Sequence, residues 1–214
     1  MVNVLDLFIG LVGLALAGFV LQKNLWRALL CVAPHSMRIE PDAPADAMRV
    51  PGELSRLEAD VKALGFVPIG SRLERPRLTK ELVSYDFAHV EDKVFVTLYL
   101  GRDRRPRLYF LSHTDRDAFV ITANYRRPAR EVPGRYFCGA LEDASTERVF
   151  KAHQRRVASF GSPVGRFDQE GRLAAARAWF GGPGKVEVRL QNLHGLLWSV
   201  GTLGMVAAAL FGKR

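Results

Sequence analysis

The sequence predicts an α+β protein tethered to a membrane: an antiparallel β-meander of about five or six strands, flanked by amphipathic helices, with one transmembrane helix at each end of the chain. Three observations lead to this prediction. Residues 4–21 and 193–211 are apolar runs of membrane length. Between them, short segments rich in β-branched and aromatic residues alternate with turn compositions. Segments with apolar residues at helical spacing lie on either side of these strands.

The first apolar run, residues 4–21, reads VLDLFIGLVGLALAGFVL and contains Asp6 as its single charge. At about 1.5 Å per residue it comes close to the roughly 30 Å of a bilayer's hydrocarbon. A cleaved signal peptide is the alternative, because residues 15–17 (ALA) resemble a cleavage site. Signal peptides begin with basic residues, however, whereas residues 1–6 contain only an acid. We therefore expect a spanning helix, and residues 22–33 are compatible with its continuation out of the bilayer.

The second apolar run, residues 193–211, carries no full charge. A buried helix of a soluble core is the alternative, since such helices are apolar all round. Lys213 and Arg214 follow the run as charged anchors would, and Trp26 and Trp198 lie near the ends of the two runs. These anchors favour a second spanning helix.

Basic residues beside the two runs predict the orientation. Four lie on the domain side and two on the other, which favours a cytoplasmic domain in the cell (inner) membrane; they are Lys23, Arg27, Lys185 and Arg189 against Lys213 and Arg214. The two cysteines, Cys31 and Cys138, fit a reducing compartment as well as a single disulfide.

The segment after the first span, residues 34–52, contains four prolines and is predicted to be an extended linker. A soluble α+β domain is expected over residues 53–161. It should begin with a helix over residues 53–64, which has leucines and valine at helical spacing and Gly65 at its end.

The meander follows this helix. We expect further strands near residues 66–73 and 135–141, although their signals are weaker, and four strands at residues 82–90, 93–100, 107–114 and 118–125. Connections this short predict antiparallel neighbours, because a parallel pair needs a crossover. A second helix is expected over residues 145–160, with one apolar stripe formed by Val149, Phe150, His153, Val157 and Phe160.

The connecting segment, residues 162–192, supports more than one interpretation. Residues 169–180 fit a helix, which we favour, although residues 168–171 also fit a hairpin turn. Residues 181–184 (GGPG) break the chain, and apolar residues then alternate as in a strand up to Leu190.

One cluster, His113, Asp115 and Asp117, has the residue types of a metal or acid/base site. Hairpin turns also favour aspartate at such positions for their own backbone hydrogen bonds, so we expect no metal here. His153 lies on the apolar stripe of its helix and is expected to be a buried, hydrogen-bonded core residue. Cys138 is expected to be a small buried residue. Motifs of nucleotide-binding and hydrolytic enzymes are absent from the sequence, and we expect no cofactor.

The turns of a meander alternate between the two ends of the sheet, and here this alternation separates charge. The turns at residues 91–92 and 115–117 gather acids at one end. The opposite end gathers bases from three connections and has few acids, which predicts a one-sided field; the bases are Arg75, Arg77, Lys80, Arg102, Arg104, Arg105, Arg107, Arg126, Arg127 and Arg130. We expect these arginines to bind anionic lipid headgroups or an acidic protein partner.

Other partners are judged from charge and from small residues. The net charge of +9 is not accompanied by a nucleic-acid-binding motif, so nucleic acid is not an expected partner. Small residues at a spacing of four, Gly13 and Ala17 and then Gly204, Ala208 and Gly212, predict helix–helix association in the membrane.

We therefore expect a two-span membrane protein whose cytoplasmic domain is a binding, scaffolding or sensory module, an accessory subunit without identifiable catalysis. The alternative is a membrane-bound hydrolase with its site near His113, Asp115 and Asp117.

Overall fold

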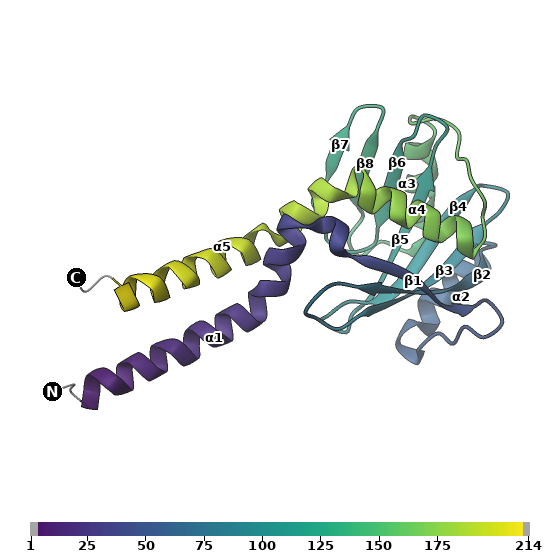
Figure 1. The fold of residues 1–214 in the computed structure, drawn as a ribbon. Helices are drawn as coiled ribbons and strands as arrows, with labels where there is room; N and C mark the ends of the chain where they lie inside the picture. The colour runs from purple at the N-terminus through teal and green to yellow at the C-terminus, as the bar shows by residue number, and fades with distance from the viewer. Residues whose placement is uncertain (1–3, 212–214) are drawn as a thin grey trace. The chain divides into compact units, whose positions relative to one another are not determined.

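The computed structural model describes residues 4–211 and contains two compact units (Figure 1). One unit is helical and consists of the N-terminal residues up to Met37, residues 76–80 and the segment from Gly184 onward. The other, the sheet unit, comprises Arg38–Arg75 and Glu81–Pro183.

The helical unit is built from two long helices, α1 (Val4–Val32) and α5 (Gly184–Phe211), with the short 3₁₀ helix η1 (Pro34–Ser36). Both long helices are long and apolar enough to cross a membrane. Large apolar side chains such as Phe8, Leu11 and Leu14 are more than half exposed, unlike those of a helix buried in a soluble core. Residues 76–80, which connect two strands of the sheet, group with these helices.

The two long helices pack on each other along one seam. On α5 the residues with low exposure recur at alternating spacings of three and four, the period of a left-handed helix pair, and include Val188, Gly195, Ser199 and Thr202. The two helices approach closely at Gly195, where an added Cβ would lie 2.3 Å from the Cβ of Arg27. The backbones approach here because glycine has no side chain.

The small residues singled out in the sequence lie mostly off this seam. A Cβ added to Gly13 or Gly204 would meet no atom within 4 Å among the described residues, and Ala208 is exposed. Ala17 is partly buried, and Gly212 lies outside the described residues. α1 and α5 pack on each other through Gly195 and its neighbours rather than through these small residues, and helix–helix association in a membrane stays a prediction.

The sheet unit contains eight strands in the order β1-β2-β3-β4-β5-β6-β8-β7. Their bounds are β1 (Arg38–Pro44), β2 (Val67–Arg75), β3 (Leu82–His89), β4 (Val94–Leu100), β5 (Pro106–His113), β6 (Phe119–Ala123), β7 (Arg130–Val132) and β8 (Tyr136–Ala140). Strands β1 to β6 are antiparallel, so the core of the predicted meander is present.

The sheet is nevertheless mixed, and the prediction of a purely antiparallel meander with five or six strands is wrong. β8 pairs parallel with β6, and β7 forms the edge beyond β8. Residues 124–135 make this possible, because the connection that holds β7 is long enough to act as a crossover. At the other edge, β1 lies in the proline-rich stretch predicted to be a linker. Its prolines are tolerated because an edge strand leaves half of its N–H groups unpaired.

Helices cover both faces of the sheet, giving three layers (Figure 1). α2 (Ser55–Ala63) and α3 (Thr146–Val157) contact one face, where the core includes Leu54, Phe87 and Phe110. α4 (Gln169–Gly181) contacts the opposite face, near β1 and β2. The fold therefore includes β1 and α4 in addition to the domain predicted over residues 53–161.

The segment after α4 corrects another expectation. Residues 186–190 are helical and not a strand, because α5 already begins at Gly184. The helix predicted over residues 169–180 is present as α4, and its N-cap Asp168 accepts a hydrogen bond from the N–H of Gly171 at 2.8 Å.

Candidate functional site

Eight of the basic residues named in the sequence analysis lie at one end of the sheet, where the alternation of turns puts them. β2 ends, β3 begins, and β4 connects to β5 at this end, and β6 also ends here. We call the following residues the basic end: Arg75, Arg102, Arg104, Arg105, Arg107, Arg126, Arg127 and Arg130. Arg77 and Lys80 belong to residues 76–80 and are described with the helical unit.

Acidic residues partly neutralise the basic end. Arg104 Nη2 lies 2.6 Å from Glu53 Oε1, an acid that precedes the meander. Arg107 Nη2 lies 2.9 Å from Asp103 Oδ2, and its guanidinium stacks over Tyr125 with 5.0 Å to the ring centroid. Arg75 lies between Glu40 and Glu81. These pairs are exposed, so water and salt screen them and each contributes little to stability.

The connections from the sheet unit to α1 and to α5 both leave from this same end. β1 begins at Arg38, whose Cα partner is Arg75 at the end of β2. α4 runs opposite to β1, since Gln169 donates to the carbonyl oxygen of Ala43 and Arg177, later in the helix, donates to that of Ile39. α4 therefore ends at the basic end, where the guanidinium of Arg127 lies 5.8 Å from the ring of Trp179.

The cluster of His113, Asp115 and Asp117 lies at the opposite end. His113 Nε2 and Asp117 Oδ1 are 2.9 Å apart. Asp115 Oδ1 instead accepts from the backbone N–H of Ser162 at 3.1 Å, and so fixes the loop after α3. Asp117 has a φ of 54°, the left-handed turn conformation that aspartate tolerates. Among residues 4–211, the structure shows no group of three or more His, Cys, Asp or Glu side chains that could hold a metal ion.

An open hollow of about 380 Å³ lies beside His113, between the sheet and α4. Its lining is mostly small or apolar and includes Phe95, Val164 and Ala175, with Arg166 and Glu170 paired to each other. Asp115 and Asp117 do not line it, so the three predicted polar groups do not converge on one cavity. The hydrolase alternative remains a prediction that this geometry does not favour.

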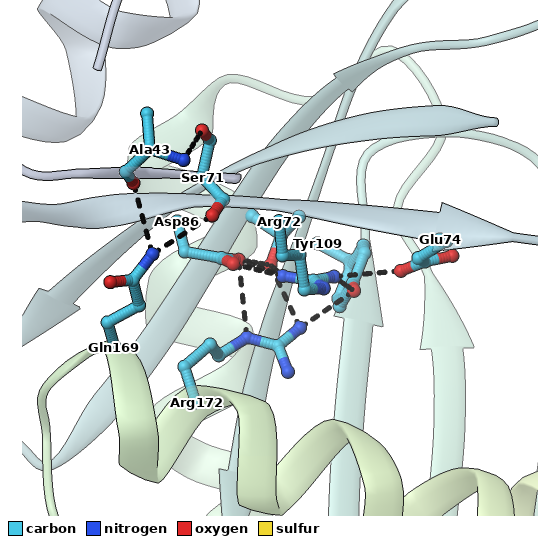
Figure 2. A network of polar contacts seen from close by, with 9 residues as sticks. Ala43, Ser71, Arg72, Glu74, Asp86, Tyr109, Gln169 and Arg172 are labelled. Carbon is cyan, nitrogen blue, oxygen red and sulfur yellow. Dashed lines mark hydrogen bonds and ion pairs between the residues drawn. The ribbon is translucent and has the colours of Figure 1, made fainter. Parts of the chain in front are cut away.

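A buried polar network lies under α4, on four adjacent strands (Figure 2). Asp86, Thr97 and Tyr109 form a continuous row, because Asp86 is the Cα partner of Thr97 and Thr97 that of Tyr109. The carboxylate of Asp86 accepts a hydrogen bond from Thr97 Oγ1 at 2.6 Å. It also accepts from the guanidinium of Arg72, which is 1% exposed.

A second buried guanidinium enters this network from α4. Arg172 Nη2 donates to Thr97 Oγ1 at 3.0 Å and to the Tyr109 hydroxyl at 2.8 Å, and its Nε lies 3.3 Å from Asp86 Oδ1. Glu74 pairs with Arg72 at 3.0 Å, and its side chain is 15% exposed. Asp86 is therefore the one carboxylate that contacts both buried arginines in the described network.

The electrostatic balance keeps Arg72 charged. Burial alone would lower the pKa of Arg72, but the surrounding negative groups, Asp86 first, raise that pKa well above its ordinary value. The network still has more donors than acceptors, since Arg72 Nε and Arg172 Nη1 have no hydrogen-bond partner among the described atoms. Buried charges of this kind stabilise a fold only while their counter-charge is present.

Gln169 makes a further link between α4 and the sheet (Figure 2). Its side-chain amide donates to the carbonyl oxygens of Ala43 in β1 and Ser71 in β2, both at 3.0 Å. The β1–β2 and β2–β3 registers shift close to this point. Gly70, with φ of 130°, leaves room for the amide, because an added Cβ would lie 2.6 Å from Gln169 Nε2. The first turn of α4 is thus fixed to the sheet by polar contacts.

His153 and Cys138 are buried, as expected. His153 hydrogen-bonds to Ser112 at 3.1 Å and to Thr122 at 3.0 Å, and burial lowers its pKa to about 3. Although a serine beside a histidine is a common catalytic pair, both side chains here are 0% exposed and no substrate reaches them.

The sequence analysis did not identify Arg72, Asp86 or Arg172. The available signal was Asp86 itself, a charge between Tyr85 and Phe87 in an apolar strand, since such a charge needs a buried partner. Its partners were not predictable, because α4 and β2 are brought to it only by the tertiary fold.

Comparisons with protein-family models, with curated proteins and with solved structures gave no match to this chain.

Proposed function

We propose that the chain is a two-span membrane protein whose sheet unit is a binding, scaffolding or sensory module, held with its basic end toward an anionic membrane surface. The observation that carries the proposal is connectivity: the chain enters the sheet unit at β1 and leaves it after α4 at the same end that gathers the arginines. Five residues separate α1 from β1, and two separate α4 from α5. Connections of this length limit how far the chain can extend between α1 and β1 and between α4 and α5.

The helices support the membrane part of this proposal. α1 has 29 residues and is therefore about 43 Å long, which exceeds the roughly 30 Å of hydrocarbon in a bilayer. The C-terminal part of α1 carries amphipathic residues: Lys23 lies 4.2 Å from the ring centroid of Phe19, Arg27 lies near Trp26, and Arg27 hydrogen-bonds to His194 of α5. Side chains of these types are typical of the membrane–water interface. The last turns of α1 and the first turns of α5 then project from the bilayer as a short stalk.

The positive charge of the basic end favours an orientation of the sheet unit in which this end faces an anionic membrane. Each base near an anionic membrane contributes about 1 kcal/mol. Three exposed arginines of the turn, Arg102, Arg104 and Arg105, together contribute at most about 3 kcal/mol toward facing the lipid, and Glu53 and Asp103, which pair with Arg104 and Arg105, reduce this value. The same surface suits an acidic segment of a protein partner, which would be recruited close to the bilayer.

The test uses the full chain in nanodiscs. A fluorescent donor is placed on Ala129→Cys, an exposed position in the β6–β7 connection, and energy transfer to labelled lipid headgroups is measured. We expect transfer to be stronger with anionic than with zwitterionic lipid and to fall with added salt. Replacing Arg102, Arg104 and Arg105 by glutamine should weaken the dependence on lipid charge.

A matched control removes three bases from elsewhere on the unit: Arg148, Lys151 and Arg155 of α3, all exposed, changed to glutamine. This variant should keep the dependence on lipid charge. If both triple variants behave alike, or if transfer ignores lipid charge at low salt, the headgroup version is wrong and an acidic protein is the partner to seek.

The cytoplasmic orientation is part of the proposal and is tested separately. Val90→Cys provides an exposed thiol, whereas both native cysteines are buried. An impermeant thiol reagent should fail to label this position in intact cells, and labelling there would reverse the orientation.

A further inference from the structure

The turn between β2 and β3 has three features that the proposed attachment to the membrane through α1 and α5 does not require: its grouping with these helices, two exposed bases and an exposed leucine. Residues 76–80 (PRLTK) form the tip of the hairpin between β2 and β3, and they group with α1 and α5. Arg77 and Lys80 in this tip are exposed. Leu78 between them is 66% exposed, although its side chain is apolar.

The backbone of Leu78 makes this exposure informative. Its φ is 62°, in the left-handed region that favours glycine. The other non-glycine residues with positive φ in the described chain are Lys93, Arg104, Asp117 and Asp143, which are all polar. Turns commonly place glycine or asparagine at such a position. A leucine here gains nothing for the turn itself and contributes nothing to the core, so its side chain is expected to act outside the unit.

We propose that the tip of the β2–β3 hairpin is a membrane-inserted anchor: Leu78 enters the headgroup–acyl boundary, and Arg77 and Lys80 bind lipid phosphates. A bilayer is the occupant that fits, because the tip groups with the two candidate spans and offers an apolar side chain flanked by bases. Residues of these types are the ones that hold peptides in the interface. The inference rests on the proposed membrane tether, and it adds a contact with the bilayer to the two proposed spans.

The experiment places an environment-sensitive label on Leu78→Cys in the full chain, reconstituted in nanodiscs of mixed zwitterionic and anionic lipid. The native cysteines are 7% and 0% exposed, so the label should go to the introduced thiol, and the unsubstituted chain measures the background. Quenching by lipids brominated near the headgroup is compared with quenching by aqueous iodide. Val90→Cys is the matched control, because Val90 is an apolar residue with 60% exposure in the turn at the other end of β3.

We expect the label at residue 78 to be quenched severalfold more by brominated lipid, and severalfold less by iodide, than the label at residue 90. If both labels are equally open to iodide while the protein resists alkaline extraction, the anchor is wrong and the tether stands. If the protein is extracted by alkaline washing, the tether itself fails. If residue 78 is protected in native membranes but not in nanodiscs, a protein covers the tip and the lipid version is overturned.

A second variant separates insertion from folding. Leu78→Gly suits the left-handed φ, so thermal unfolding should be unchanged or shifted upward. A label on Thr79→Cys should nevertheless lose its protection from iodide in the Leu78→Gly chain. Unchanged protection would show that the leucine is not the anchor.

Discussion

Replacement of Asp86 by asparagine tests whether the buried network depends on a single carboxylate. The change keeps the shape of the side chain but removes the charge that faces both Arg72 and Arg172. Asp86 and both guanidiniums are at most 4% exposed, so water does not replace the lost charge. Removal of one partner from a buried ion pair costs about 3–5 kcal/mol. The sheet unit has about 140 residues, and for that size the cost corresponds to a fall of roughly 10–20 °C in its Tm.

The assay follows thiol exposure on heating in detergent. Cys138 is 0% exposed in the sheet unit, so its reaction with a thiol reagent reports unfolding there, and Cys31→Ala removes the signal from the helical unit. Glu74→Gln is the control, because Glu74 contacts only Arg72 within the network and is partly exposed. This variant should cost clearly less than Asp86→Asn, because Glu74 contacts only one of the two buried guanidiniums and Asp86 still faces both.

A double variant then tests the electrostatic explanation. Arg172→Met alone removes the hydrogen bonds to Thr97 and Tyr109, but together with Asp86→Asn it also removes one uncompensated charge. The two changes should therefore cost less together than the sum of the single costs. Strictly additive costs, or a Tm for Asp86→Asn within about 2 °C of the unsubstituted protein, would refute the reasoning.

Two further predictions concern His153 and Gly195. His153 is neutral in the folded state with a pKa near 3, whereas in the unfolded chain its pKa is about 6.5. The unfolded state thus binds one more proton between these values, and the unfolding free energy should fall by up to about 1.4 kcal/mol per unit as the pH drops from 6.5 to 5. His153→Gln should remove this slope in urea titrations; an unchanged slope would assign it to other groups. Gly195→Val should force α1 and α5 apart, because a Cβ there meets Arg27 at 2.3 Å, and should raise the thiol reactivity of Cys31. Gly204→Val should leave the reactivity of Cys31 unchanged, because a Cβ at Gly204 meets no atom within 4 Å. Equal effects of the two variants would contradict the packing of α1 against α5 at Gly195.

The sequence predicted those helices, strands and turns that are determined by residues close together in the chain. The apolar runs, the turns of the meander and the stripe that contains His153 each depend on residues close together in the chain. β1 and β7 were missed for the opposite reason. β1 is rich in proline and is a strand only because β2 offers it an edge. β7 has three residues and pairs with β8, which itself lies between β7 and β6. Neither pairing leaves a periodic signal in the sequence.

The position of the basic end was predictable because strand alternation alone determines it. Antiparallel pairing of β2 to β6 sends every second connection to the same end, whatever covers the faces. The effective charge of the basic end was not predictable, because Arg104 pairs with Glu53, which lies before the first strand of the predicted meander. Whether the basic end faces a membrane was not predictable either, because this also depends on the tertiary fold. A charged sheet end becomes a membrane-facing surface only if the connections to the spans leave from it, and here that depends on the unexpected strand β1 and on the direction of α4. The two elements that fell outside the predicted domain are therefore the ones that support the proposed orientation.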